Sequence, residues 1–588
     1  MEKFHSRIRE LKSSGKLPGR TEINSAISTF SKREWIIFTI FIVILLFSTV
    51  SILQNINEHF MVEVPSRGGS ITEGIVGVPR FINPVLVNST GDDNMVALIY
   101  SGLMRKNPTG DLIPDLALKY EISNNGLVYT FTLKDNLVFH NGSPLSSSDI
   151  LFTINKIKDK ENKSPYKINW DGVNIETPDE KTVIFTLKQP YASFLENTTL
   201  GILPEYLWNA SPLELNSLNT NPIGSGPYMV NKTSRQSSGI IDSYELIPFK
   251  KFALGEPYIK KLRLEFYQNE EDIIKMLRDK NIEQVGPISP ENTEILEKEG
   301  YQIESSILPR IFGLFFNQSQ NQLFIDKTII KIINEAIDKN KIIREVLLGY
   351  GITIDSPIPP TMLDYQKLSG IERVARVEVL EKVRENLAKA GWKKNQEGFL
   401  EKTIKEKNTS KTVKLEFSIS TGNVAELTKV AELIKQDLSE IGIKIDIKTF
   451  ELGNLNQNVI RPRKYDALLF GQIINRESDL YAFWHSSQRK DPGLNVALYT
   501  NAKVDKILEE AFTTLDEDAR VKKYIQFEDE IKKDMPAIFL YSPDFIYVVS
   551  KDLNQYKMQN IIAPKDRYLN AYLWYKETEK VWKIFTNN

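Results

Sequence analysis

The sequence predicts a multi-domain α/β protein that is held at a membrane by a single N-terminal helix. Residues 35–53 contain no charged side chain, and roughly 520 residues of mixed helical and strand periodicity follow them. A region of that length is enough for three or four domain-sized units, with more than one apolar core. We therefore expect one membrane-spanning helix followed by a large folded region.

The apolar segment from Trp35 to Leu53 has the length and composition of a transmembrane helix. Fourteen of its nineteen residues are Ile, Leu, Phe or Val. A helix of this length spans roughly 28 Å, close to the ~30 Å hydrocarbon core of a bilayer. Residues 1–34 carry eight basic and four acidic side chains, which by the positive-inside rule predicts a cytoplasmic tail.

We expect this helix to remain attached as a single-pass anchor in the cell membrane. A cleaved signal peptide is the alternative interpretation, but the leader is long and no clean small-x-small site follows the apolar segment. Residues 54–67 are mostly polar and are predicted to form a tether. The remaining chain is then the extracytoplasmic main domain.

Composition excludes several classes of function. The chain contains no cysteine, which excludes disulfides, thiolate metal sites, cysteine nucleophiles and the acylated cysteine of bacterial lipoproteins. Residues 54–588 carry 67 Lys or Arg against 72 Asp or Glu, so their formal charge is −5. No basic footprint for nucleic acid is present, and we expect no nucleic-acid partner.

The first half of the outer region shows strand periodicity. Apolar and polar residues alternate over 129–133, a turn follows at Asp135-Asn136, and Val138 and His140 follow the turn, which predicts a hairpin-like β region. Residues 183–187 predict another strand.

The second half contains a β-α-β unit. Alternating residues predict strands over 413–419 and 443–447, and the apolar positions of 427–441 recur at helical spacing. Gly442 is a typical residue to end that helix. The unit implies two parallel strands joined by a right-handed crossover.

Further helices are predicted on either side of this unit. Asp326 can cap a helix that runs to Ala336, and a second helix over 341–348 ends at glycines. Helical periodicity returns over 504–534 and ends before Pro536.

The chain shows no catalytic or metal-binding motif. Its four histidines are His5, His59, His140 and His485, and no two of them have metal-ligand spacing. We expect His140, in the sequence FHNG, to make structural hydrogen bonds near a turn. No nucleophile elbow, phosphate loop or dinucleotide fingerprint follows a strand. We therefore expect a binding protein without cofactor or metal, rather than an enzyme.

From Gly68 onward the chain resembles the family 5 extracellular solute-binding proteins, which serve dipeptide, oligopeptide and nickel ABC importers. Motifs that match the family in sequence and order are Gly68-Gly69, Phe81-Ile82-Asn83-Pro84, Tyr100-Ser101-Gly102-Leu103, Gly110-Asp111-Leu112-Ile113-Pro114-Asp115-Leu116-Ala117, Pro222-Ile223-Gly224-Ser225-Gly226-Pro227-Tyr228, Leu314-Phe315-Phe316-Asn317, Ala390-Gly391-Trp392 and Pro536-Ala537-Ile538. They span most of the outer region and none of the tail or helix.

The resemblance implies a two-lobed periplasmic-binding-protein-like fold with an extra β-rich subdomain. The first lobe would comprise residues 68–307 completed by 541–588, and the second lobe residues 308–540. The chain would cross between the lobes near Ser306 to Asn317 and near Pro536 to Tyr541. Two crossings form a hinge, which allows the lobes to close on a ligand.

The resemblance also implies which residues bind the ligand. Main-chain contacts to an extended peptide would come from Gly77, Val78, Pro79 and Arg80 and from Gly471, Gln472 and Ile473, as in strand addition. Peptide-binding members often place an aspartate shortly after the second-lobe glycine, to meet the peptide ammonium. Here Asn475 occupies that place, and Glu477 and Asp479 lie close by but out of register; Gln472 replaces a family tryptophan.

The function that the resemblance implies is a membrane-anchored, monomeric receptor that captures peptides or similar small solutes in an interlobe cleft and delivers them to an ABC permease and ATPase complex. A tethered sensor or chaperone-like peptide-binding protein without transport is the alternative. An extracytoplasmic hydrolase is disfavoured because a nucleophile constellation is missing.

Overall fold

The computed structural model describes residues 19–362, 376–406, 409–558 and 561–586. The chain divides into two compact units, which we describe separately. The smaller unit comprises residues 1–66 and 577–588, and the larger unit comprises residues 67–576. Residues 1–18 of the predicted cytoplasmic tail lie outside the described residues.

The smaller unit contains the predicted membrane helix. Helix α2 (Arg20–Ser28) precedes α3 (Lys32–Phe60), whose N-terminus is closed by a capping box between Ser31 and Glu34. Helix α3 is long and apolar enough to cross a membrane, and none of its residues is buried. The predicted span, 35–53, lies entirely within it.

The segment after the apolar span differs from the polar tether that we expected. Helix α3 continues to Phe60, and β1 (Met61–Ser66) pairs antiparallel with β23 (Glu577–Trp582). Residues 577–588 therefore belong to the same compact unit as residues 61–66, whereas the sequence prediction assigned them to the first lobe. Strand β1 contains one charged residue, Glu63, and β23 contains three, and nothing in the sequence indicated that these two distant segments pair.

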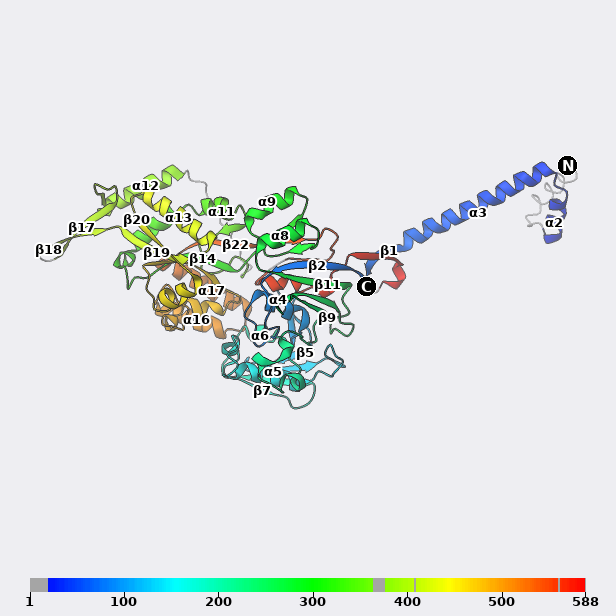
Figure 1. The fold of residues 1–588 in the computed structure, drawn as a ribbon, viewed down its shortest axis with the longest axis horizontal. Helices are drawn as coiled ribbons and strands as arrows, with labels where there is room; N and C mark the ends of the chain where they lie inside the picture. The colour runs from blue at the N-terminus through cyan, green and yellow to red at the C-terminus, as the bar shows by residue number, and fades with distance from the viewer. Residues whose placement is uncertain (1–18, 363–375, 407–408, 559–560, 587–588) are drawn as a thin grey trace. The chain divides into compact units, whose positions relative to one another are not determined.

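A twelve-stranded sheet runs through the larger unit (Figure 1). Its path has the order β20-β19-β21-β14-β22-β12-β2-β11-β10-β9, and β13 and β15 pair with β22 beside this path. The strands are β2 (Gly68–Val76), β9 (Tyr228–Arg235), β10 (Ile241–Pro248), β11 (Ile259–Tyr267), β12 (Gln284–Val285), β13 (Gln302–Ile307), β14 (Arg310–Phe316), β15 (Gly351–Thr353), β19 (Glu416–Gly422), β20 (Lys444–Phe450), β21 (Ala467–Ile473) and β22 (Ala537–Val549).

Strand β22 joins the two halves of this sheet. Its C-terminal part pairs with β12 and β13, and its N-terminal part pairs with β14 and β15. The switch of partner lies between Asp544 and Tyr541 of β22. Asp544 pairs with Ile307 of β13, and Tyr541 pairs with Phe312 of β14. The hydroxyl of Ser542 lies 2.8 Å from the carbonyl oxygen of Leu308, which fixes the two crossing segments to each other.

The buried apolar side chains form separate clusters on either side of this crossing. We call residues 67–308 with 545–576 the first lobe and residues 309–544 the second lobe; every buried cluster lies within one of them. The fold is the predicted two-lobed α/β architecture.

Helices cover both halves of the sheet (Figure 1). Those of the first lobe are α4 (Thr90–Ile99), α5 (Ser147–Lys158), α6 (Phe194–Asn197), α7 (Glu205–Trp208), α8 (Glu270–Arg278) and α9 (Pro290–Lys298). Those of the second lobe are α10 (Lys327–Ala336), α11 (Lys339–Glu345), α12 (Arg376–Lys389), α13 (Ala425–Glu440), α14 (Leu452–Asn454), α15 (Asp479–Trp484), α16 (Ala502–Thr513) and α17 (Glu517–Asp534).

The extra β-rich subdomain of the first lobe is a four-stranded antiparallel sheet. Its order is β5 (Ala117–Ile122), β6 (Val128–Leu133), β8 (Thr182–Leu187) and β7 (Val173–Glu176). The predicted strands 129–133 and 183–187 are confirmed and pair with each other. The predicted hairpin with residues 138–140 is wrong: Val138 forms only an isolated bridge with Pro144. Asn136, at φ 56°, turns the chain away from β6.

The predicted β-α-β unit is confirmed in the second lobe. Strands β19 and β20 are parallel and are joined by α13, whose apolar positions are buried. Val413, which we placed at the start of this unit, instead belongs to β18 (Thr409–Lys414), which pairs with β17 (Leu400–Glu406) next to β16 (Lys393–Lys394). The single strand that we predicted over 413–419 therefore spans parts of two strands, β18 and β19.

Helix caps explain most of the remaining boundaries. Asp326 caps α10 as expected, because its carboxylate accepts the backbone N–H of Thr328 at 2.9 Å. The helical periodicity of 504–534 corresponds to two helices, since Asp516 accepts the N–H of Ala519 and starts α17 anew. Helix α17 ends at Asp534, and the capping residue Met535 has a left-handed backbone conformation before Pro536.

His140 makes structural hydrogen bonds at a turn, as predicted. Its Nδ1 accepts the backbone N–H of Gly224 at 3.3 Å, so its Nε2 carries the proton and donates to the carbonyl oxygen of Gly226 at 3.1 Å. Burial lowers the pKa of this imidazole to about 4. The His140 side chain in the folded first lobe is therefore neutral, with its proton on Nε2.

Acidification is expected to destabilise the first lobe through His140. The pKa of His140 falls from 6.5 to about 4 on folding. Its contribution to the free energy of unfolding is therefore complete above pH 6.5 and is lost as the pH falls toward 4. By pH 5 the loss is about 2 kcal/mol. We expect the His140→Gln variant, whose amide can keep both hydrogen bonds, to lose less thermal stability between pH 7 and pH 5 than the parent protein. Equal losses in parallel thermal melts contradict this assignment.

Candidate functional site

A cavity of about 340 Å³ lies between the two lobes. Its walls come from the first lobe except for Asn475 and Arg476, which follow strand β21 in the second lobe. Four cationic and four anionic side chains line it: Arg105, Lys106, Arg476, Lys565, Asp93, Asp115, Glu196 and Asp566. Cavities of this size are typical of sites for small ligands.

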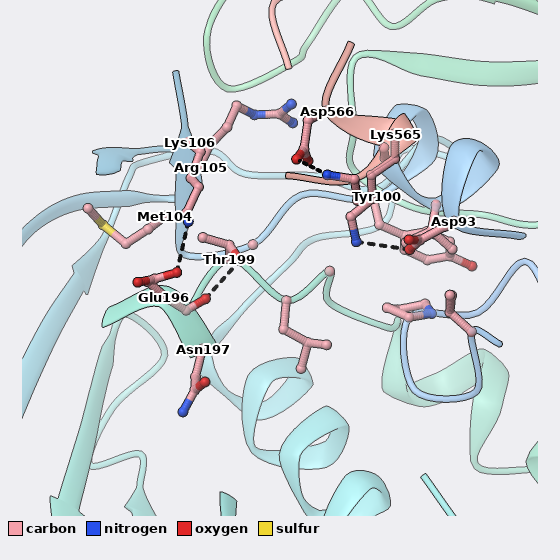
Figure 2. Close-up of a pocket in the computed structure, with 18 of the residues that line it drawn as sticks. Asp93, Tyr100, Met104, Arg105, Lys106, Glu196, Asn197, Thr199, Lys565 and Asp566 are labelled. Atoms are coloured by element: carbon pink, nitrogen blue, oxygen red, sulfur yellow. Dashed lines mark hydrogen bonds and ion pairs between the residues drawn. The ribbon is translucent and has the colours of Figure 1, made fainter. Parts of the chain in front are cut away.

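Three of the cations are neutralised by carboxylates of the same wall. Lys106 Nζ lies 2.8 Å from Glu196 Oε2, and Lys565 Nζ lies 2.9 Å from Asp93 Oδ1 (Figure 2). The Lys106 side chain comes from strand β3 (Met104–Lys106), which pairs with β4 (Leu112–Pro114). The third pair, between Arg105 and Asp115, is 2.9 Å long and almost completely buried.

The fourth carboxylate, Asp566, is held by backbone groups. It accepts the N–H of Ile562 at 2.9 Å and that of Ala563 at 2.8 Å. Burial raises the pKa of Asp566, although Lys565 and these two N–H groups favour its charged form. The first-lobe wall of the cavity is thus fixed by internal ion pairs and hydrogen bonds.

Several of the family-like motifs meet at this cavity. Pro84 of the FINP motif, Tyr100 and Gly102 of YSGL, and Asp115 of GDLIPDLA all line it. Gly102 packs so closely that a Cβ atom would lie 2.6 Å from the backbone carbon of Thr199. The motifs therefore shape the wall of the site, although the sequence gave no reason to assign ligand contacts to them.

Arg476 connects the second lobe to the first lobe across the edge of the cavity. Its Nη1 donates to the hydroxyl of Tyr191 at 3.1 Å and to Oδ1 of Asn197 at 2.5 Å. The Tyr191 hydroxyl also lies 3.2 Å from that of Ser478, and its ring stacks on Phe512 with centroids 4.7 Å apart. The lobes are in contact here.

Asp479 orients the loop that carries Asn475 and Arg476. Its Oδ2 accepts the backbone N–H of Asn475 at 2.9 Å and that of Arg476 at 3.2 Å, while its Oδ1 lies 3.9 Å from Arg476 Nε. Burial raises the pKa of Asp479, and the Arg476 charge opposes that shift. The nearby Glu477 is engaged with Arg520 at 2.5 Å. Both acids already have protein partners.

Of the nine residues predicted to bind ligand, only Asn475 lines this cavity. The segment from Gly77 to Arg80 follows β2, where Asp92 Oδ1 accepts the N–H of Arg80 at 2.7 Å. On β21, Gly471 pairs with Phe312, while Gln472 is 2% and Ile473 49% exposed. Strands β12, β22 and β14 separate β2 from β21 in the sheet. The main-chain role of these segments stays a prediction.

Sequence reasoning missed the residues that connect the lobes. Arg476 stands next to Asn475 in a loop after a strand, a position where charged residues often have functional roles. Its partners Tyr191 and Asn197 lie some 280 residues away in the chain, and a single sequence gives no signal of such pairing. Within the described part of the chain, no group of three or more His, Cys, Asp or Glu residues is arranged to hold a metal ion.

Substitution of Asp479 by Asn is expected to loosen the loop without altering recognition of a peptide ammonium. The carboxylate already accepts two backbone N–H groups, and weakening such charge-assisted bonds costs about 1–2 kcal/mol. We expect a lower melting temperature and similarly weakened binding of free and N-acetylated peptides. Asp446→Asn, at an exposed position, is the matched control. An unchanged melting temperature with selective loss of binding to free N-termini contradicts this role.

Comparisons with known proteins agree with the fold. The model of the bacterial extracellular solute-binding proteins, family 5, matches residues 111–492. The oligopeptide-binding protein AppA of Bacillus subtilis is 26% identical over 521 residues, covering 87% of this chain and 92% of that protein.

Two solved structures share the architecture over most of their length. The complex of Bacillus subtilis AppA with a nonapeptide superposes with a TM-score of 0.66 at 25% identity, covering 87% of this chain and 99% of that one. Campylobacter jejuni NikZ in complex with Ni(L-His) gives a TM-score of 0.68 at 26% identity, covering 86% and 99%. The family model covers more than half of the chain, and this protein therefore belongs to family 5 of the bacterial extracellular solute-binding proteins.

Proposed function

We propose that this protein captures short peptides, or solutes of similar size, in the cavity between its lobes and delivers them to an ABC importer. The observation that carries the proposal is the cavity itself, because both lobes contribute to its wall and the first-lobe charges are already paired. A ligand enclosed there would contact both lobes only when they are closed. Such ligand-dependent closure is what a permease can recognise.

The size of the cavity favours a small ligand. Its volume of about 340 Å³ is near the lower end of the ~300–1,000 Å³ range for small-molecule sites. Related proteins of comparable identity were solved with ligands as different as a nonapeptide and Ni(L-His). Ligand size therefore has to be inferred from this chain, and we infer a peptide of a few residues. Gly77 to Arg80 and Gly471 to Ile473 do not line this cavity, and main-chain contacts from them to a ligand remain a separate proposal.

Closure would occur about the two segments that cross between the lobes. These are residues 308–310 and 542–544, which are joined by the Ser542 hydroxyl and by the N–H of Leu308 donating to Pro543 at 3.0 Å. A hinge of a few residues at strand junctions is a common arrangement in domain closure. The contacts of Arg476 with Tyr191 and Asn197 would break when the lobes open.

Helix α3 would hold the receptor at the cell membrane. Its apolar side chains are exposed over a length that suits a bilayer, and basic residues precede it. We propose an uncleaved anchor with a cytoplasmic N-terminus and an extracytoplasmic main domain. The partners would be the permease and ATPase of an importer, with the receptor itself monomeric.

One purification tests the receptor and the anchor together. The native protein would be extracted from membranes in mild detergent, and mass spectrometry applied to its N-terminal peptide, its bound small molecules and its associated proteins. We expect a peptide that includes residues before Trp35, short peptides released on denaturation, and permease and ATPase subunits. A mature N-terminus near Asn55 contradicts the anchor, and bound peptides without importer subunits favour the tethered sensor. Release of only non-peptide solutes contradicts the peptide assignment.

A further inference from the structure

The least compensated cation in the cavity is Arg476. The other three cations each have a carboxylate oxygen within 2.9 Å, on Asp93, Asp115 and Glu196. The carboxylate closest to Arg476 Nε is 3.9 Å away, and its second oxygen is engaged by two backbone N–H groups.

The guanidinium also retains unused donors. Nη1 donates to two neutral acceptors, the Tyr191 hydroxyl and the Asn197 amide oxygen. Among the described residues, Arg476 Nη2 has no hydrogen-bond partner, and the side chain is 18% exposed where it lines the cavity. Arginine is suited to bind a carboxylate through two parallel N–H groups, so this donor set fits a ligand carboxylate.

The acidic side chains of the cavity offer less to a ligand cation. Asp115 is completely buried against Arg105, and Asp93 and Glu196 form close pairs with lysines. Asp566 accepts two backbone N–H groups. Glu196 also lies close enough to Arg476 to influence its charge, but the Glu196 carboxylate is 2.8 Å from Lys106.

We propose that Arg476 is a specificity-determining residue that selects solutes with a free carboxylate, such as the C-terminus of a short peptide, and holds that group against the second lobe. The inference rests on the proposed function and deepens it. It differs from the expectation based on Asn475, which concerned a missing acid for the ligand ammonium. The present inference concerns the residue after Asn475, the cation Arg476, and the carboxylate of the ligand.

A comparison of peptide acids with peptide amides tests this assignment. Oligo-alanines of two to five residues, each as free acid and as C-terminal amide, would be titrated calorimetrically into ligand-free protein. We expect the acid to bind about tenfold to a hundredfold more tightly than the amide, as for a hydrogen bond to a charged group. In Arg476→Gln this ratio should fall to near one, and Arg476→Lys should keep part of it.

The control variant is Arg461→Gln, which removes an exposed second-lobe arginine paired with Asp491 at 3.6 Å. It should keep the parent ratio. Equal weakening of acid and amide by Arg476→Gln would show that the residue only holds the lobes together, and equal binding of acid and amide to the parent protein would likewise overturn the inference. If the parent protein binds none of these peptides, the proposed function fails first, and this inference fails with it.

Discussion

The pairing of strand β22 with both halves of the sheet is the constraint on which the rest of the structure depends. This single strand of thirteen residues hydrogen-bonds to β12 and β13 in the first lobe and to β14 and β15 in the second. Because the buried apolar clusters are separate in the two lobes, the crossing segments supply the covalent connection between them, reinforced by hydrogen bonds at the crossing itself. They allow each lobe to be rigid while the angle between the lobes can change.

The cavity follows from that arrangement. The first lobe builds most of its wall, with ion pairs and backbone hydrogen bonds that hold charged side chains in place without a ligand. The second lobe adds only the loop after β21, which Asp479 orients through two backbone N–H groups. A short loop that is fixed on one lobe and faces the other is well placed to report whether the lobes are closed. Arg476 lies in this loop and contacts Tyr191 and Asn197 of the first lobe.

Local patterns in the sequence predicted individual elements well. The long apolar helix over 35–53, the β19-α13-β20 unit, the cap at Asp326 and the structural hydrogen bonds of His140 depend on neighbouring residues, and the structure contains all four. Failures occurred where long-range pairing decides the outcome. The alternation around Val413 did not reveal two strands with different partners, and residues 61–66 gave no sign of pairing with strand β23 more than 500 residues away. The motifs indicated the family, but the residues that line the cavity are brought together from positions hundreds of residues apart.

The most direct test is the distance between the lobes with and without ligand. Because the chain contains no cysteine, single cysteines at the exposed positions Lys160 and Lys522 would carry one spin label on each lobe. Pulsed electron-spin distance measurements would be made on ligand-free protein and after addition of a casein digest rich in short peptides. The account predicts a broad distribution without peptides and a shorter, narrower one with them. An identical distribution in both samples, with peptide binding verified by mass spectrometry, would contradict capture by closure of the lobes.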